Sequence, residues 1–508
     1  MGINVWRAVL VTVAVTGCTV GPDNERAPMW SPSSWFGSKR PAPKVASEPV
    51  PAPVDTAWWN AFHDPVLTGL IERAAAANLD VRSATARVAQ ARAQRGVGAA
   101  AEFPQLNGNS SATRQRLSRN GATSIFSGGG GGAGGGGEPG TAANGLGGAQ
   151  GGAFPTSRSI PPFDLFQGGL DASYELDLWG RVRRSIESAD ASLVASNEAR
   201  RSALISTTAE IARSYLQLRN TQAQLAIGRA NLATAKESAY LTDARSRGGL
   251  ATDLDVASAL AQQEATAATL PALEQQEAQG INAIGLLLAM PPAALSSELS
   301  PPRPVPPVPP TVPVGLPSEL ARRRPDIRQA EAQLHAATAD IGVAEAEFYP
   351  RITLSGRVSL QSTQLKSLFS VASAAYAFGP SLSIPIFEGG RIRRMVELRE
   401  AQQQEAAIQY QRVVLQAFTD VDNALIAYNA EQRRQGFLRA QVAQARRALG
   451  LAQSRYRQGV SDFLEVLTAQ RTVLAAEQQQ ADSQAIVSEN LVALYKALGG
   501  GWEQAYPE

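Results

Sequence analysis

The feature that most restricts the fold is a long stretch that occurs twice, at residues 181–256 and 391–466. Each copy starts with a Gly-Arg-x-Arg-Arg run, at Gly180–Arg184 and Gly390–Arg394, and ends in a glycine-containing turn followed by Leu-x-Val. Equivalent residues of the two copies are 210 residues apart throughout. Because neither copy has gained or lost net length, the length itself is under constraint, as a rigid rod would require.

Apolar residues recur every seven positions in each copy, which predicts left-handed supercoiled helices. In the first copy they are Leu204, Ile211, Leu218, Leu225, Leu232 and Ala239, and in the second Val414, Val421, Tyr428, Val442 and Leu449, with polar Gln435 interrupting. No proline lies between Arg181 and Arg247, so a helix of roughly 67 residues, about 100 Å long, is allowed. An amphipathic helix folded back into a globular bundle is the alternative, which so long a pattern disfavours.

Composition argues against an enzyme or a nucleic-acid-binding protein. The 508 residues carry a net charge of +2, with two histidines and one cysteine. The near-neutral charge gives no support to nucleic-acid binding, and the few histidines and cysteines leave little for a metal site. The glycine-rich run lacks the GKS or GKT ending of a phosphate-binding loop. We expect no catalytic residues, no metal and no cofactor.

The chain starts like an exported bacterial lipoprotein. Residues 1–17 contain Arg7, an apolar run and then Val15-Thr16-Gly17, directly before the sole cysteine, Cys18. This order indicates a signal peptide and resembles a lipobox, in which Cys18 is lipidated and becomes the first residue. An ordinary secretory signal is the alternative. Thr19 in place of aspartate favours the outer membrane, and the Pro/Ala/Ser-rich residues 18–64 are expected to form an extended tether.

The duplication divides the rest of the chain. The first repeat, 65–289, has Asp64 as N-cap and Pro65 at the first helical position of helix Val66–Ala101, then a strand pair at 103–178 and a helical hairpin at 181–289 with its tip near Gly249. After a proline-rich connector at 290–318, the second repeat, 319–499, has a helix at 326–348, a strand pair at 350–388 and a hairpin at 391–498 with its tip near Gly459. Residues 500–508 form a tail.

Two of the shorter helices, Asp253–Ala289 and Asp326–Phe348, together match one long helix in length. We therefore expect them to stack end to end beside it.

The strand pairs alternate apolar and polar residues, as in Leu170–Leu178 and Ile352–Leu360. Period two predicts strands with one apolar and one polar face. The first pair is 36 residues longer, and the excess coincides with the glycine-rich segment 128–152, which we interpret as a loop. No run approaches the ~18 apolar residues of a transmembrane helix, so strands would have to span a membrane. Four strands cannot close a membrane barrel; the barrel must be shared between subunits.

Several motifs carry a family resemblance. They are the lipobox with TVGPD, WWNAFHDPVL (Trp58–Leu67), LDLWGR (Leu176–Arg181), ELARRRPDIRQAEAQL (Glu319–Leu334), SIPIFEGGR (Ser383–Arg391) and YRQGVSDFLEVLTAQR (Tyr456–Arg471). In this order they resemble the TolC-type outer-membrane efflux proteins, particularly the OprM-like lipoprotein branch. The resemblance implies an α+β membrane protein and a homotrimer with a twelve-stranded barrel continued by twelve packed helices. It also implies two partners, a periplasmic adaptor and an inner-membrane pump of the resistance-nodulation-division class.

The two hairpin tips are the candidate functional sites. Their glycines supply positive φ after a helix C-terminus, and Thr252 or Ser461 could cap the next helix. They are Gly249, Leu250, Ala251 and Thr252 in the first tip, and Gly459, Val460 and Ser461 in the second. They are helix-breaking turns on any interpretation, and the resemblance implies that they also contact the adaptor.

A gate beside the tips is implied by the resemblance. Asp255 and Tyr456 fall where family members tie neighbouring coils into a closed aperture, and we expect a hydrogen bond between them. Glu465 and Thr468 share a helix face where relatives present inward acidic rings. Threonine at 468 departs from that pattern, and a solvated surface charge is the alternative for Glu465.

Three functions fit these features. The first is passive efflux of drugs or small molecules through an outer-membrane channel, favoured by the lipobox and the WWNAFHDP motif. The second is the outer channel of a type I protein secretion system. The third, a coiled-coil lipoprotein without a channel, is opposed by the alternating strands.

Overall fold

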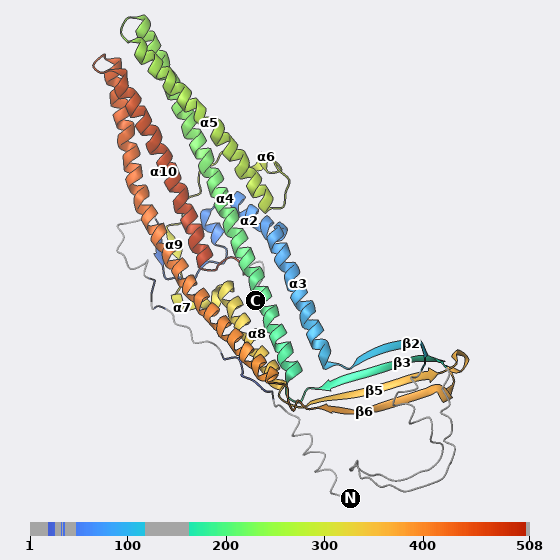
Figure 1. The fold of residues 1–508 in the computed structure, drawn as a ribbon. Helices are drawn as coiled ribbons and strands as arrows, with labels where there is room; N and C mark the ends of the chain where they lie inside the picture. Colours follow the sequence, from blue (N-terminus) through green and yellow to red (C-terminus); the bar gives the residue numbers. More distant parts are fainter. Residues whose placement is uncertain (1–18, 26–31, 33, 36–46, 117–161, 504–508) are drawn as a thin grey trace, which may run out of the picture. The chain divides into compact units, whose positions relative to one another are not determined.

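The computed structural model describes residues 19–25, 32, 34–35, 47–116 and 162–503 (Figure 1). They form two units: a sheet unit within 99–182 and 347–388, and a helical unit that comprises the rest. The predicted signal peptide, the predicted lipidation site at Cys18, the glycine-rich segment 128–152 and residues 504–508 lie outside the described residues.

The sheet unit contains four strands, β2 (Gln105–Gln115), β3 (Phe163–Leu176), β5 (Arg351–Ser362) and β6 (Ala374–Ser383). They form one sheet in the order β2-β3-β5-β6, and every neighbouring pair is antiparallel. Each copy of the repeat supplies one hairpin-like pair, as expected, and β3 and β5 join the two pairs. Strands β2 and β6 are the edges of this sheet.

The two faces of the sheet differ in chemistry. One row across the strands aligns Leu170, Val358 and Tyr376, whose side chains are largely exposed. The next row aligns Asp171 with Arg357, which form an ion pair. Alternation along the strands therefore separates an apolar from a polar face, as period two predicts.

The first repeat supplies helices α2 (Pro65–Ala77), α3 (Leu79–Ala99), α4 (Arg181–Arg247) and α5 (Asp253–Leu287). Asp64 caps α2 by accepting from the backbone N–H groups of Val66 and Leu67, with Pro65 at the first position. The single helix expected over Val66–Ala101 is wrong. It is broken at Asn78, whose side chain accepts from the amides of Asp80 and Val81 and so starts a new helix.

The second repeat supplies α7 (Pro317–Arg323), α8 (Pro325–Ala346), α9 (Arg391–Arg457) and α10 (Phe463–Ala497). Helices α4 and α9 each have 67 residues, and α5 and α10 each have 35. The two hairpins are therefore matched helix by helix.

The expected stacking of the shorter helices is wrong. Helix α8 packs against α9, where α10 also packs, so α10 and α8 together flank α9 (Figure 1). The two short helices beside α9 are therefore α8 and α10, which both belong to the second repeat.

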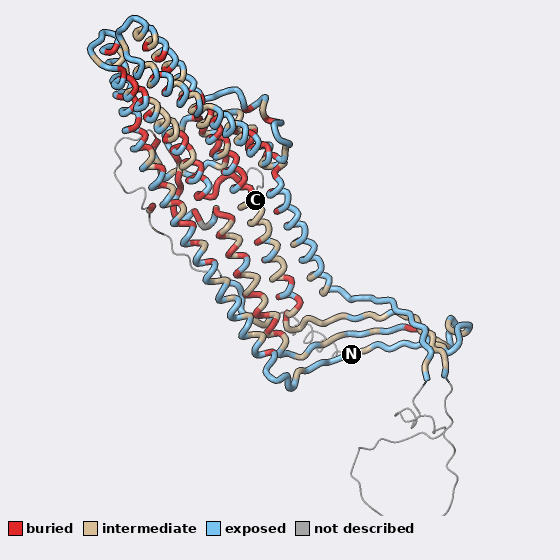
Figure 2. The backbone as a smooth tube through the Cα atoms, turned by 45° about the horizontal axis from the view of Figure 1, so that its top comes forward, coloured by how far each residue is buried: buried red, intermediate tan, exposed pale blue. Residues whose placement is uncertain are grey.

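Buried residues recur along the long helices (Figure 2), and the heptad positions are among them. Leu204, Ile211, Leu218, Leu225 and Ala239 are buried on α4, and Val414, Val421, Tyr428 and Val442 on α9. Polar Gln435, at the interrupting position, is buried too. The repeat of seven thus marks the contacts between packed helices. No helix within the described residues combines the length and apolarity needed to cross a bilayer.

The connector is more ordered than an extended strap. It contains helix α6 (Ser296–Leu299) and strand β4 (Thr311–Pro313), which pairs in parallel with β1 (Glu48–Val50). Fully buried Arg219 on α4 donates to the carbonyls of Leu299 and Pro301, at 3.1 Å each. The connector is therefore fixed to the long helix by a buried cation.

Candidate functional site at the hairpin tips

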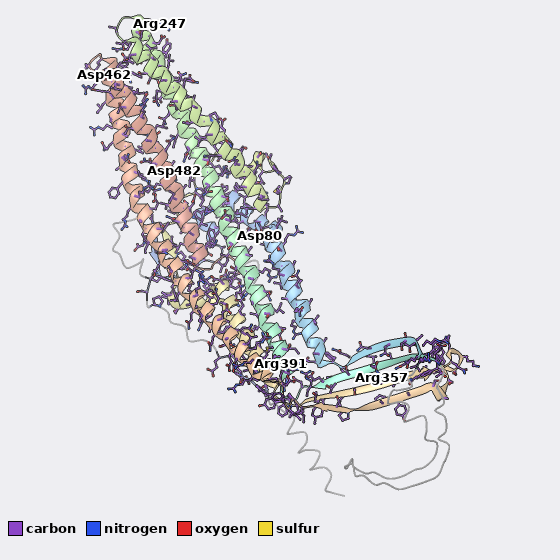
Figure 3. All side chains as sticks on the ribbon, in the orientation of Figure 1. Asp80, Arg247, Arg357, Arg391, Asp462 and Asp482 are labelled. Carbon is purple, nitrogen blue, oxygen red and sulfur yellow. The ribbon has the colours of Figure 1, made fainter. Side chains whose placement is uncertain are left out.

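The two tips have the same backbone structure. Gly249 and Gly459 have φ of +70° and +75°, a region that favours glycine. Leu250 N–H donates to Arg245 O (2.8 Å) and Val460 N–H donates to Arg455 O (3.0 Å), 210 residues further on. Arg247 and Asp462, labelled in Figure 3, lie beside these turns. Both tips therefore end their helices in the way that the sequence predicts.

The helices that follow are capped differently. Thr252 caps α5: its hydroxyl accepts from Asp255 N–H (3.2 Å), while the Asp255 carboxylate accepts from Thr252 N–H (3.0 Å). This is a complete capping box. In the second tip the cap is Asp462, which accepts from Glu465 N–H (3.3 Å), so the expectation that Ser461 caps α10 is wrong. The Asp462 carboxylate accepts an amide hydrogen bond, and its negative charge interacts favourably with the positive end of the helix dipole.

Arg245 ties the first hairpin to the second. Its Nη1 donates to the carbonyls of Tyr456 (2.9 Å) and Arg457 (3.2 Å), the last residues of α9. Its guanidinium carbon lies 4.6 Å from the centroid of the Tyr456 ring, a cation–π geometry. Tyr456 is buried, with Phe463 edge-on at 5.5 Å. One arginine thus caps a helix of the other hairpin and covers its buried aromatic residue.

The structure does not bring Asp255 and Tyr456 together. The Asp255 carboxylate accepts from the Thr252 hydroxyl (2.8 Å), and the Tyr456 hydroxyl donates to Thr242 Oγ1 (3.4 Å). The hydrogen bond expected between them is therefore not formed within the chain. The Asp255 carboxylate bonds within its own turn, and the Tyr456 hydroxyl bonds to Thr242 on α4 of the first hairpin.

Glu465 and Thr468 are both exposed on α10. Glu465 lies 3.9 Å from Arg455, and the Thr468 hydroxyl donates to Leu464 O (2.8 Å) within the helix. An exposed carboxylate beside an exposed guanidinium is a pair that can exchange partners, because such pairs are weakly held.

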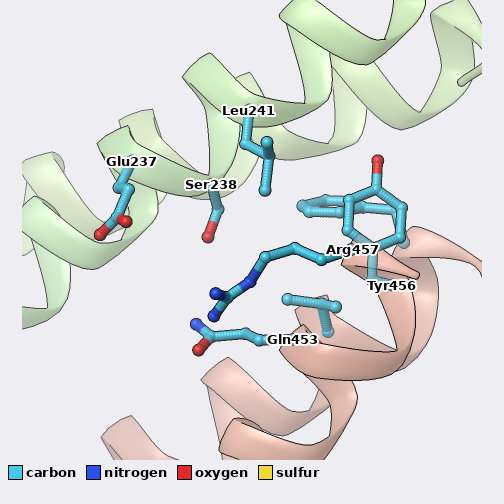
Figure 4. Close-up of a pocket in the computed structure, with 8 residues that line it drawn as sticks. Glu237, Ser238, Leu241, Gln453, Tyr456 and Arg457 are labelled. Atoms are coloured by element: carbon cyan, nitrogen blue, oxygen red, sulfur yellow. The ribbon is translucent and has the colours of Figure 1, made fainter. Parts of the chain in front are cut away.

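A pocket opens between the two hairpins just behind the tips (Figure 4). Ser238 and Leu241 of α4 face Gln453 and Arg457 of α9 across it. The full lining is Glu237, Ser238, Leu241, Gln453, Tyr456, Arg457, Phe463 and Val466. Both walls are mixed: α4 supplies Glu237 and Leu241, and the second hairpin supplies Arg457 beside the Tyr456 and Phe463 rings.

The residues directly after Cys18 are fixed in place. The buried Arg184 guanidinium donates to Val20 O (3.3 Å), Gly21 O (3.2 Å) and the Asp23 carboxylate (2.7 Å). The segment crosses α8 at Gly342, where an added Cβ would lie 2.8 Å from Val20 O. The tether expected over 18–64 therefore starts with a docked segment.

A histidine supports this docking site. Glu187 contacts both Arg184 (2.8 Å) and His335 Nε2 (2.8 Å). Burial alone would raise the pKa of Glu187, but the hydrogen bonds from His335 and Arg184 lower it below its ordinary value. The carboxylate therefore stays ionised and helps to hold Arg184.

Arg245, whose side chain joins the two tips, is not among the residues that the sequence predicts. The last turns of α4 and α9 both hold basic residues, Arg245 and Arg247 in one and Arg455 and Arg457 in the other. Basic residues are common in the last turn of a helix because their charge interacts favourably with the negative end of the helix dipole. Only the packing shows that Arg245 reaches a different helix.

A duplicated chain with two length-matched helical hairpins, and one antiparallel strand pair from each copy, defines the architecture of TolC-type channel proteins. The chain belongs to the outer membrane efflux protein family, whose model matches residues 70–289 and 316–500. It is accordingly a protein of the outer membrane.

Relatives match over nearly the whole chain. Outer membrane protein OprJ of Pseudomonas aeruginosa is 33% identical, covering 98% of this chain and 96% of that protein. The pyoverdine export outer membrane protein OpmQ of the same species is 35% identical, over 88% and 87%. Among solved structures, the outer-membrane channel OprN is 34% identical with a TM-score of 0.82, covering 96% of this chain and 100% of that one. The resemblance to TolC-type efflux proteins is thereby confirmed.

Proposed function

We propose that the protein is the outer-membrane exit channel of a tripartite efflux system, through which drugs or other small molecules leave passively. The observation that carries this proposal is the exact match in length of two hairpins whose tips end in the same turn. Rods of equal length put both tips at one depth, where they form a common mouth. A relative named for pyoverdine export, 35% identical, favours a small molecule over a secreted protein as cargo.

The active form in this proposal is a homotrimer. The sheet has two free edges, β2 and β6, and an edge strand offers unpaired N–H and C=O groups to another chain. Pairing of β6 in one copy with β2 in the next closes three sheets into a twelve-stranded barrel. The apolar row at Leu170, Val358 and Tyr376 suits a lipid-facing surface. The lipid on Cys18 supplements this insertion.

The tips serve two purposes in this proposal. Their exposed turn residues, such as Leu250 and Val460, contact the periplasmic adaptor, which links the channel to an inner-membrane pump of the resistance-nodulation-division class. Behind them the Arg245–Tyr456 contact keeps the two hairpins of one chain together in the closed state. Glu465 from three copies surrounds the axis and favours cations. Asp255, near the start of α5, and Thr468, near the start of α10, also line this aperture in the proposal.

Conductance and efflux test this function together. We expect purified full-length protein to form ion channels of low conductance in planar bilayers, and Arg245→Ala to raise that conductance by freeing the end of α9. In a strain that lacks the protein, the wild-type gene should restore efflux of a fluorescent dye. Absence of any channel from properly folded trimers would contradict the proposal.

A further inference from the structure

Arg245 and Arg455 occupy the same place in two copies of one structure. They are 210 residues apart, and each supplies the carbonyl that closes its tip turn, to Leu250 and to Val460. The following glycines have nearly the same φ, +70° and +75°. The two side chains therefore leave their helices at equivalent points.

Their surroundings are not equivalent. Arg245 donates to the carbonyls of Tyr456 and Arg457 at the end of α9. The side chain of Arg455 is 56% exposed, and its charged neighbour is Glu465 at 3.9 Å. The end of α4 also lacks what the end of α9 has: within the described chain, no arginine donates to the carbonyls of Ser246 and Arg247. Among the residues that the structure describes, Arg455 therefore binds no helix end of its own chain, and the end of α4 has no arginine bound to it. These two are the counterparts of Arg245 and the end of α9.

Symmetry brings the two together. In a closed ring of identical chains with the hairpins side by side, first and second hairpins alternate around the ring. The contact from a first to a second hairpin lies within one chain, and the contact from a second to the next first hairpin lies between chains. We propose that Arg455 repeats the contact of Arg245 in trans: it caps α4 of the next copy by donating to the carbonyls of Ser246 and Arg247. This rests on the proposed trimer.

The acceptor surface differs from its counterpart in a way that suits an exposed arginine. Ser246 stands where the second tip has Tyr456, and Asp253 stands where it has Phe463. Asp253 is exposed, so its carboxylate is open to a cation from another copy. Arg455 thus meets a carboxylate where Arg245 meets an aromatic ring. To do so it leaves Glu465, which frees that carboxylate.

The two kinds of interface should therefore respond differently to salt. The contact within a chain is backed by buried Tyr456 and Phe463, whereas the contact between chains depends on exposed charges, which salt screens. Raising ionic strength loosens the interfaces between chains first, and the mouth opens along them. Arg455 is the residue that sets this preference.

Cross-linking tests the contact directly, because Cys18 is the sole natural cysteine. Arg455→Cys with Arg247→Cys, treated in membranes with a short bifunctional maleimide, should yield covalent dimers and trimers on a denaturing gel. The matched control is Arg245→Cys with Arg457→Cys, the same pair shifted between copies, which should cross-link within one chain without a gain in mass. Native mass spectrometry of the untreated protein reports the trimer independently. Trimers in which only the control pair cross-links would overturn the trans contact alone, and a protein that is not trimeric would overturn both proposals.

Charge reversal gives a second test that does not depend on cysteine. Arg455→Glu should raise channel conductance several-fold at low salt, since two acidic groups then face each other. Arg455→Glu combined with Asp253→Arg should return conductance to the wild-type range. An Arg455→Glu variant with wild-type conductance, or a double variant with no recovery, would refute the assignment.

Discussion

The two repeats build the same junction with different chemistry. At the start of the helix that leads to the strands, the first repeat has Asn78 and the second, 246 residues on, has Arg324. The Asn78 amide donates to Leu287 O (2.8 Å), the last residue of α5. Arg324 donates to Ala497 O (2.9 Å), the last residue of α10. Leu287 and Ala497 are themselves 210 residues apart, so the carbonyl groups that are bound occupy equivalent positions in the two copies.

The difference shows what a charge adds. Asn78 satisfies the carbonyl, caps α3 and accepts from the Thr207 hydroxyl on α4 (3.4 Å), all without an ionic partner. Arg324 is nearly buried and requires two carboxylates, Asp326 (2.6 Å) and Asp420 (3.2 Å), which tie α8 to α9. Both junctions thus join three helices, but the neutral one needs no ionic partner, whereas the charged one needs two carboxylates. Loss of the charged residue should do more damage.

The largest effect is therefore expected for Arg324→Ala. The substitution removes several charge-assisted hydrogen bonds of a nearly buried guanidinium, each worth about 1.5–3 kcal/mol, and it leaves Ala497 O without its donor. Asn78→Ala should cost less, about 1–3 kcal/mol for one buried polar partner. Thermal unfolding of both variants in detergent, followed by circular dichroism, measures the order. Equal shifts, or a larger shift for Asn78→Ala, would show that the charge adds nothing.

Gly342 and Gly96 give a sharper comparison, since they occupy equivalent positions in α8 and α3. A Cβ at Gly342 would lie 2.8 Å from Val20 O, whereas nothing lies within 4 Å of one at Gly96. Gly342→Ala should cost about 1–3 kcal/mol by overpacking and speed hydrogen exchange in residues 19–25. Gly96→Ala should stabilise by about 0.5–1 kcal/mol through helix propensity. Unchanged exchange at 19–25 in Gly342→Ala would disprove the docking.

Glu489 differs from its counterpart Gln279 in its response to pH. Burial raises the pKa of Glu489, although Arg213 and a hydrogen bond with Gln217 oppose the shift. A carboxyl whose pKa is raised on folding contributes stability below its unfolded pKa and loses it as pH rises through the folded pKa. Glu489→Gln should therefore melt at a modestly higher temperature than wild type at pH 8 and no higher at pH 4. A difference that grows towards acid would reverse the sign and refute this account.

The smallest effect is expected for Tyr456→Phe. It removes only the 3.4 Å hydrogen bond to Thr242, while the ring keeps its contacts with Arg245 and Phe463. A long hydrogen bond contributes at most about 1 kcal/mol, so conductance should stay close to wild type. Markedly higher conductance would show that the hydroxyl, and not the ring, holds the tip.

The long helices could be predicted because local rules decide them. The seven-residue repeat, the absence of proline and the glycine turns set the bounds of α4 and α9 at the residues observed. The break at Asn78 rests on a local cap to Asp80 and Val81, but an asparagine within a helical pattern does not by itself reveal a cap. The bond that fixes Asn78 there goes to Leu287 O, more than 200 residues away. The sequence does not separate Ser461 from Asp462 as the cap of α10, because serine and aspartate are both common N-cap residues and the two positions are adjacent. Arg245 was missed because its partners lie on another hairpin, which no local pattern encodes.

The docked segment after Cys18 also limits the reach of the lipid that we propose on that cysteine. Two residues, Thr19 and Val20, separate Cys18 from Gly21, which is three steps along the backbone, and an extended chain spans at most about 3.5 Å per step. The backbone of Cys18 is thus held within roughly 10 Å of Gly21, and Gly21 lies against Gly342. So short a segment would hold the proposed lipid close to one side of its own chain, at the same place in every copy.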